Sequence, residues 1–349
     1  MNKDNSQIDT ALDKNKFVEL SEREKIQRIS SIIKYAEKKL KRRFPILEKQ
    51  NLLGALIIAY SCLAFLLNSY LFVKGIIPAW VCIVLNAFCT SFLHEMEHDL
   101  IHHIYFKTKP AVQNFFMSII WLFRGNLISP WYRKWIHLVH HRESGQIVDI
   151  EERLIGNGMP YGFRRFITMF DTSLSWINFN EMKKQIPHFK VVDILKATFP
   201  IFIIFNVIWF SFLAHQGWKF LGFVQDVVPP FPTWYIGLVN FLMVIYVAPN
   251  MLRQFSLSLV SSSCHYYGDI KKGDLLKQVQ VLKPWFLFPF QLFCFNFGST
   301  HVIHHFVVNQ PFYLRQLVAP FAHAAMKKYG VRFNDLSTFL TGNRYSQAA

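Results

Sequence analysis

The sequence predicts an all-α membrane protein with four transmembrane helices in two hairpins and a cytoplasmic helical cap. Three observations lead to this fold class. Hydrophobic residues make up 52 % of the 349 residues and aromatic residues 17 %, which is high for a soluble chain. Four long segments contain no charged side chain, and ten of the fourteen histidines fall into three clusters between or after them.

The composition also restricts the partners and the redox chemistry. A net charge of +16 fits either nucleic acid or anionic lipid, and the apolar segments decide for membrane lipid, with no nucleic acid expected. The five cysteines are odd in number, form no CxxC pair and mostly lie in apolar stretches, which is typical of packing thiols. They are Cys62, Cys82, Cys89, Cys264 and Cys294.

The four predicted spans cover residues 51–73, 75–93, 197–214 and 234–252. Each is close to the roughly 20 apolar residues that a bilayer requires. Only Lys74 joins the first pair, which predicts a tight hairpin. The second pair is separated by about twenty residues that include Pro229, Pro230 and Pro232, and prolines end helices.

Basic residues predict the orientation. The two outer connections offer only Lys74 and Lys219, whereas residues 1–50, 93–195 and 253–349 are rich in lysine and arginine. The positive-inside rule therefore places both termini and the long stretches on the cytoplasmic side. We divide the chain into a basic N-terminal segment (1–50), a membrane domain (51–315) and a cytoplasmic C-terminal segment (316–349).

Three further segments are expected at the membrane surface. Ser21 and Glu24 fit a capping box, and Ile26, Ile29, Ile33, Ala36 and Leu40 recur at helical spacing among basic residues. This amphipathic helix either lies on the membrane or packs on its own domain. The apolar runs 111–123 and 285–297 are short for spanning and suit interfacial or re-entrant segments.

The histidine clusters have the spacing of metal ligands. They read His94-Glu-Met-Glu-His98-Asp-Leu-Ile-His102-His103, His137-Leu-Val-His140-His141 and His301-Val-Ile-His304-His305. Residues three or four apart share one face of a helix, so each cluster projects several imidazoles in one direction. Imidazole binds zinc, copper, iron and nickel, and the repetition of the pattern indicates metal.

Counting the imidazoles indicates two metal ions, because one ion takes only about four protein ligands. Nine ligands are predicted: His94, His98, His137, His140, His141, His265, His301, His304 and His305. His102 is a possible tenth, and His103 is a weaker candidate. The chain crosses the membrane twice between the second cluster and His265. All clusters then meet only if the two short apolar runs do not cross.

Charged residues near the clusters have two interpretations. Glu95, Glu97, Asp99 and Asp149 either hydrogen-bond ligand imidazoles or form a solvated face. Basic residues beside the clusters either hold a substrate head group or anchor the chain at the interface, and the positive-inside rule favours anchoring. These basic residues are Arg124, Arg133, Lys134, Arg142 and Arg153.

With these motifs in order, the chain resembles the membrane fatty acid desaturase superfamily, which includes alkane and fatty acyl hydroxylases. The resemblance covers residues 51–315 and implies two non-haem iron ions, O2 as co-substrate and a fatty acid or fatty acyl substrate. Ser-Cys-His265-Tyr-Tyr-Gly is similar to the family's isolated ligand histidine. Acyl-CoA desaturases have an asparagine one helical turn before that histidine, contributing through water, where this chain has Ser261.

Desaturation is the expected reaction, with hydroxylation and decarboxylation as alternatives. Residues 141–145, 149–153 and 297–301 are similar to desaturase-like enzymes that form terminal alkenes from free fatty acids. The sequence shows no GxGxxG fingerprint, no CxxC pair and no haem domain. We therefore expect a reductase and a separate electron carrier of the ferredoxin, rubredoxin or cytochrome type on the basic face.

Two other classes of protein are less compatible with the sequence. A histidine-rich metal transporter would place ionisable groups inside its spans, whereas here the histidines lie beyond the span ends. A zinc-dependent membrane hydrolase needs fewer ligands than the nine candidates.

Overall fold

The computed structural model describes residues 20–156, 158–170, 173–174, 190–222 and 231–345. Most of the predicted 1–50 segment is included from residue 20 onward, whereas Pro229 and Pro230 lie outside the described residues. Helices make up most of the described chain. Four two-residue strands form two small parallel pairs: β1 (Tyr267–Gly268) with β4 (Arg344–Tyr345), and β2 (Gln280–Val281) with β3 (Arg332–Phe333). The predicted all-α class is confirmed.

Among the described residues, four helices are long and apolar enough to cross a membrane, as predicted. They are α3 (Gln50–Val73), α4 (Ala79–Ile101), α11 (Ile201–Gly222) and the continuous helix Thr233–Cys264. The last has 32 residues and is about 48 Å long, which exceeds the roughly 30 Å hydrocarbon core. Its second half therefore extends beyond the membrane. The predicted span 234–252 covers only the first part of this helix.

The fourth span consists of α12 (Thr233–Leu242), a π-helical turn (Met243–Val247) and α13 (Ala248–Cys264). A π turn leaves a backbone carbonyl without its usual partner, which is costly in lipid. Asn86 of α4 supplies the partner, because its Nδ2 donates to the carbonyl oxygen of Ile245 at 3.0 Å. The turn is therefore accommodated by a neighbouring helix.

The two short apolar runs have the shapes expected of segments that do not cross. The first forms α5 (Pro110–Phe123), which has 14 residues and packs beside α3 and α4. The second begins with a 3-10 turn (Trp285–Leu287) and α15 (Phe288–Phe293), and is then bent by 73° against α16 (Phe297–Phe306). The bend directs α16 toward the other histidine-bearing helices.

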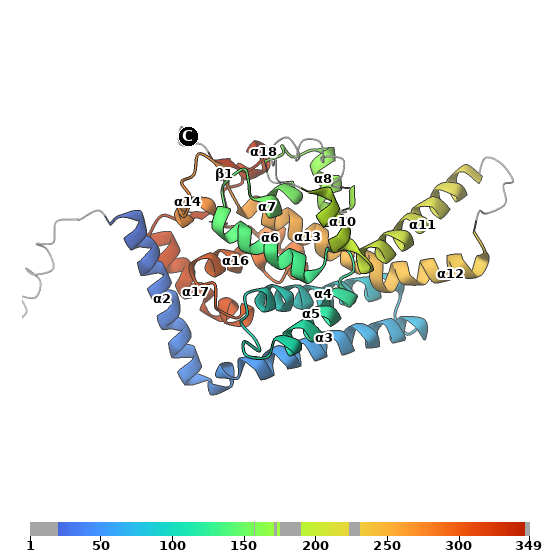
Figure 1. Ribbon diagram of the computed structural model, residues 1–349, viewed down its shortest axis with the longest axis horizontal. Helices are drawn as coiled ribbons and strands as arrows, with labels where there is room; N and C mark the ends of the chain where they lie inside the picture. The colour runs from blue at the N-terminus through green and yellow to red at the C-terminus, as the bar shows by residue number, and fades with distance from the viewer. Residues whose placement is uncertain (1–19, 157, 171–172, 175–189, 223–230, 346–349) are drawn as a thin grey trace, which may run out of the picture.

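The histidine-bearing helices lie in the middle of the molecule, and one of them, α4, is also a candidate span (Figure 1). In this view α3, α11 and α12 extend to the right, whereas α2 (Glu22–Arg43) and α17 (Phe312–Lys328) lie at the left. Between them lie α16 and α6 (Pro130–Glu143). The remaining helices are short: a 3-10 turn (Pro45–Glu48), α7 (Ile150–Leu154), α8 (Phe163–Phe170), α10 (Val191–Thr198), α14 (Leu275–Gln278) and α18 (Thr338–Thr341).

The N-terminal helix packs on its own domain, which was one of the two expected arrangements. Ser21 and Glu24 form the predicted capping box. Ile29, Ile33 and Ala36 are buried in a core shared with α16 and α17. The basic residues of α2 lie mostly on its other face and are exposed.

Candidate metal centre

Four elements bring the histidine clusters together. His94 and His98 lie on α4, with His102 directly after its last residue. The second cluster lies on α6, which begins with Pro130 after the capping residue Ser129. The third cluster lies on α16, and His265 follows the last residue of α13.

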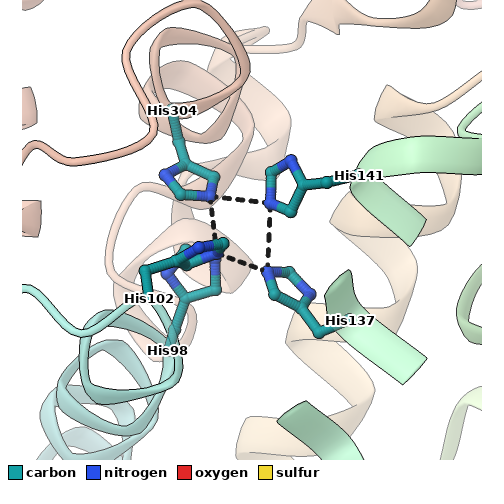
Figure 2. A group of neighbouring side chains, drawn as sticks. All are labelled: His98, His102, His137, His141 and His304. Atoms are coloured by element: carbon teal, nitrogen blue, oxygen red, sulfur yellow. Dashed lines mark hydrogen bonds between the residues drawn. The ribbon is translucent and has the colours of Figure 1, made fainter. Parts of the chain in front are cut away.

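The first histidine group consists of His98, His102, His137, His141 and His304, whose ligand atoms all lie within 4.8 Å of one another. Figure 2 shows the five rings converging from three sides. Adjacent Nε2 atoms are 2.9 Å apart for His137 and His102, 3.1 Å for His304 and His102, and 2.9 Å for His304 and His141. All five side chains thus surround one point.

The second group consists of His140, His265, His301 and His305, which are all buried and also lie within 4.8 Å of one another. The Nε2 atom of His305 lies 3.1 Å from that of His301 and 3.3 Å from that of His265. The groups adjoin, because the ring centroids of His141 and His305 are 5.0 Å apart. Together they contain nine histidines.

The hydrogen-bond geometry around these rings fits metal ions in both groups. His137 and His140 each place Nδ1 2.7 Å from a carboxylate oxygen, of Glu151 and Asp149 respectively. An Nδ1 that donates to a carboxylate leaves Nε2 of a neutral ring as a lone-pair acceptor. Such acceptors facing one another require a cation between them. Imidazole nitrogens that bind one zinc-like ion at about 2.0–2.1 Å lie roughly 3.0–3.4 Å apart, close to the spacing seen here.

The environment of His98 independently indicates a metal ion in the first group. Its ring is buried, and among the described residues neither of its nitrogens has a hydrogen-bond partner. Buried polar atoms without a partner are rare and costly. A metal ion in the first group would satisfy one of these nitrogens.

The carboxylates that orient the ligands come mainly from α7. Asp149 caps this helix and contacts His140, Glu151 contacts His137, and Glu152 lies 3.3 Å from Nδ1 of His265. Sequence reasoning identified Asp149 but missed Glu151 and Glu152. The signal that could have found them is the run of acidic residues Asp149-Ile-Glu-Glu shortly after the second cluster.

The other predicted ligand-orienting residues are buried and make different contacts. Asp99 Oδ1 is 3.6 Å from Nδ1 of His98 and 2.8 Å from Nη2 of Arg315. Glu95 also pairs with Arg315, at 3.2 Å. Ser261 accepts a hydrogen bond from Nδ1 of His265 through its backbone carbonyl, at 2.9 Å. Arg315, on α17, was not singled out from the sequence.

Two histidines of the first cluster lie outside both groups. Nδ1 of His94 lies 2.9 Å from Nη2 of Arg124. The exposed His103 contacts Lys134 and Gln113. His102, which the sequence left as a possible ligand, lies in the first group, and His94 does not. Among the described residues, the α4 cluster therefore contributes His98 and His102 to the first group, one helical turn later than the pair His94 and His98 expected from the sequence.

The structure also corrects the interpretation of three basic residues as interfacial anchors, because their side chains are buried. Arg124 and Arg133 are buried, and both bond the carboxylate of Glu97, at 2.7 and 2.6 Å. Arg153 is also buried, with its guanidinium over the ring of Tyr267. Arg142 is exposed, and Lys134 is half-buried against His103.

Electrostatics keep most of the ligands neutral. Burial lowers the pKa of His137 and His141 well below the ordinary value, and neighbouring histidines add to the shift. His140 differs: burial opposes its charged form, but the carboxylate of Asp149 outweighs burial and raises its pKa to about 10. A metal ion on Nε2 would take the place of that proton.

A cavity of about 170 Å³ opens beside both groups. Its walls include the rings of His98, His137, His140, His265 and His301. Half of the other lining side chains are apolar: Leu127, Ile128, Ile136, Ile150, Leu154, Ile155, Phe202, Leu257 and Phe297. A shallower apolar groove along α11 shares Thr198 and Phe202 with this cavity. The centre therefore faces a space suited to a hydrocarbon chain.

These features define a helical membrane protein with nine histidines gathered in a candidate metal centre at the end of its spans. The chain belongs to the fatty acid desaturase family, whose model matches residues 74–337, or 264 of the 349 residues. The matched region contains all nine histidines of the two groups. Among curated proteins, none matches the sequence significantly. Family membership makes the protein a membrane oxidoreductase that acts on fatty acyl chains.

Proposed function

We propose that the protein is an O2-dependent fatty acid desaturase with two non-haem iron ions. The observation that carries the proposal is the convergence of nine imidazoles in two adjoining groups on an apolar cavity. His98, His102, His137, His141 and His304 would hold one iron, and His140, His265, His301 and His305 the other. When bound, the iron pair supplies the oxygen chemistry needed to remove hydrogen from an unactivated C–H bond.

The chain's own residues prepare the site for this chemistry. Asp149 and Glu151 hold the Nδ1 protons of His140 and His137, which fixes these rings with Nε2 toward the cavity side. The apolar lining excludes water and holds the substrate by dispersion and burial. Substrate position relative to the two groups then decides which carbon reacts.

The substrate reaches the cavity from the bilayer in this proposal. The groove on α11 is lined by Phe202, Val207, Phe210 and Ala214, and joins the cavity at Thr198 and Phe202. Most of α11 is exposed in the described structure, as expected of a helix in lipid. An acyl chain dissolved in the membrane would therefore enter laterally along α11.

Electrons are proposed to arrive from a separate carrier of the ferredoxin, rubredoxin or cytochrome type, reduced by its own reductase. His141 is the only half-buried histidine among the nine, and the exposed Arg142 follows it directly. An acidic carrier docked here would approach the metal centre closely. The positive-inside rule supports a cytoplasmic location for this face and for both termini.

Metal analysis and product analysis test the proposal together. We expect close to two irons per chain in protein purified from iron-supplied cells, and a single zinc would contradict it. Cells given isotope-labelled fatty acids should form an internal double bond, identified by mass spectrometry. A hydroxyl group or a shortened terminal alkene would instead assign one of the two alternative reactions.

The same cells provide the controls. His304→Ala removes one imidazole from the first group and His305→Ala removes one from the second, so both should abolish product. His323→Ala removes a histidine that bonds Ser299 outside both groups and should retain activity. Turnover by pure enzyme with NADPH alone would exclude the separate carrier.

A further inference from the structure

Arg253 is a buried cation with no carboxylate partner among the described residues. It lies on α13 with its side chain fully buried, and within the described part of the chain its hydrogen bonds go to Asn126 and Gln254, both through Nη2. Nε and Nη1 have no partner among the described residues. A buried guanidinium that bonds no carboxylate is costly, which points to an anion that is present during function.

The nearby charges increase this excess of positive charge. Arg124 and Arg133 lie close enough to Arg253 to interact electrostatically, and both share the single carboxylate of Glu97. Arg133 also has Glu151 at 3.9 Å. The charge of Glu97 thus acts on all three guanidinium groups, but its carboxylate bonds only Arg124 and Arg133 among the described residues. The acidic residues that line the cavity, Glu151 and Glu152, lie against His137 and His265 instead.

A hydrogen-bond relay connects Arg253 with the cavity. Nη2 of Arg253 donates to Oε1 of Gln254 at 3.0 Å, and Nε2 of Gln254 donates to Oγ of Ser258 at 2.9 Å. Gln254 and Ser258 both line the cavity. Because the hydroxyl of Ser258 accepts from Gln254, its own hydrogen is free to be donated into the cavity. The relay thus presents a polarised donor to an acceptor there.

Ser258, Ser261 and His265 lie on one face of the helix and all line the same cavity. Ser258 precedes His265 by seven residues, or about 10 Å along the helix axis. An anion at Ser258 would therefore lie beside the metal groups without occupying a ligand position. A carboxylate with an attached acyl chain fits both the polar donor and the apolar walls.

We propose that the cavity binds its substrate as a free fatty acid, with the carboxylate on Ser258 and Gln254 and its charge balanced by Arg253. This inference rests on the proposed function and specifies the substrate of that site. A thioester or a lipid-linked acyl group has no negative charge at the acyl carbonyl and gains nothing from Arg253. The carboxylate of a free acid is stabilised by Arg253, since hydrogen bonds to charged groups are stronger than those between neutral groups.

Equilibrium binding to the full-length, iron-loaded protein in nanodiscs of neutral phospholipid tests the proposal. The probes are radiolabelled hexadecanoate and methyl hexadecanoate, which share a chain and differ in charge. At pH 8 we expect the acid to bind at least about tenfold more tightly than the ester. Arg253→Gln and Ser258→Ala should remove that preference and leave the affinity for the ester unchanged.

Arg344→Gln is the matched control, because it removes an exposed guanidinium on β4 and should keep the preference for the acid. Equal binding of acid and ester by the unaltered protein would overturn the proposal. Equal loss of both probes in Arg253→Gln would also overturn it, since Arg253 would then only brace Asn126. Ser258→Ala gives a separate answer if Arg253→Gln does not fold.

The outcomes separate this inference from the proposed function. Selective binding of the acid without any oxidised product would leave the anion site standing and refute the desaturase. Turnover of acyl groups without preference for the acid would retain the desaturase and refute the anion site.

Discussion

Nη2 of Arg124 lies 2.9 Å from Nδ1 of His94 in the interior of the protein. A guanidinium only donates hydrogen bonds, so Nδ1 of His94 accepts, and its neutral ring carries hydrogen on Nε2. This tautomer has no free lone pair for a metal. His94 therefore belongs with the arginines around Glu97, and the HxxxH pair of α4 that serves the first group is His98 with His102.

The first prediction compares these two histidines. His102→Ala should lower the iron content and abolish product, because it removes an imidazole from the first group. His94→Ala should retain the iron content of the unaltered protein. Iron per chain, measured by elemental analysis of both variants, checks the assignment. Normal iron in His102→Ala together with depleted iron in His94→Ala would restore the pair expected from the sequence.

Asp149→Asn tests the role of the α7 carboxylates. The amide is nearly the same size but no longer carries the charge that holds the Nδ1 proton of His140. We expect metal affinity to fall by about 10- to 100-fold, the usual effect of losing such a partner. Competition with a chelator of known affinity measures it. Glu143→Gln is the control, because Glu143 contacts Arg142 and Lys272 instead of histidine; equal loss in both variants would contradict the prediction.

Removal of metal should destabilise the protein. Nine imidazoles and several carboxylates are held together on buried sites, and an ion that binds only the folded state stabilises it. At free metal a hundredfold above Kd the stabilisation is about 2.7 kcal/mol. Thermal unfolding in detergent should therefore shift down after chelation and recover with anaerobic Fe2+ but not with Ca2+, which prefers oxygen ligands. An unchanged Tm after chelation would contradict this prediction, because it would mean that metal does not stabilise the folded protein.

Gly298 allows α16 to approach its neighbours closely. An added Cβ would lie 2.5 Å from Nε2 of Gln291 and 2.9 Å from Val260, and would also meet the carbonyl oxygen of Leu282. Gly298→Ala should therefore displace α16 and reduce iron binding by the second group, which depends on His301 and His305. Gly217→Ala, in open space on α11, is the control. Unchanged iron content in Gly298→Ala would contradict the prediction, because α16 would then accommodate the added methyl group without disturbing the second group.

Arg315→Met tests the ion pairs behind His98. The substitution keeps the apolar volume but leaves Glu95 and Asp99 buried without their cation. Breaking a buried pair in this way costs about 3–5 kcal/mol. A lower midpoint in denaturant unfolding checks this, and Arg315→Lys should recover part of the loss. If Arg315→Met unfolds like the unaltered protein, the two carboxylates take up protons without strain.

Most of the fold could be predicted because lipid imposes a simple requirement. A span needs about 20 apolar residues, and the sequence displays four such segments directly. The length of the last helix could not be predicted, since Arg253 and Gln254 read as the end of a span. In the structure they are buried against Asn126 and the cavity, so a polar sequence continues the same helix.

The sequence could predict a histidine-rich metal site, but it could not predict which histidines of the first cluster join the first group. Both readings of the first cluster, His94 with His98 and His98 with His102, satisfy helical spacing equally well. Only Arg124, thirty residues from His94, decides between them. Arg315 lies more than two hundred residues from Asp99, so its contact depends on tertiary packing that no local pattern records.

The π turn at Met243–Val247 lets the two halves of the fourth spanning helix face different directions. One extra residue rotates everything downstream by about 100°, since an α-helix has 3.6 residues per turn. The first half of the helix is oriented by lipid and by α11, whereas the second half presents Gln254, Ser258, Ser261 and His265 to the cavity. A straight α-helix could satisfy only one of these orientations. The additional residue therefore lets the first half insert in the membrane while the second half turns its polar residues toward the cavity.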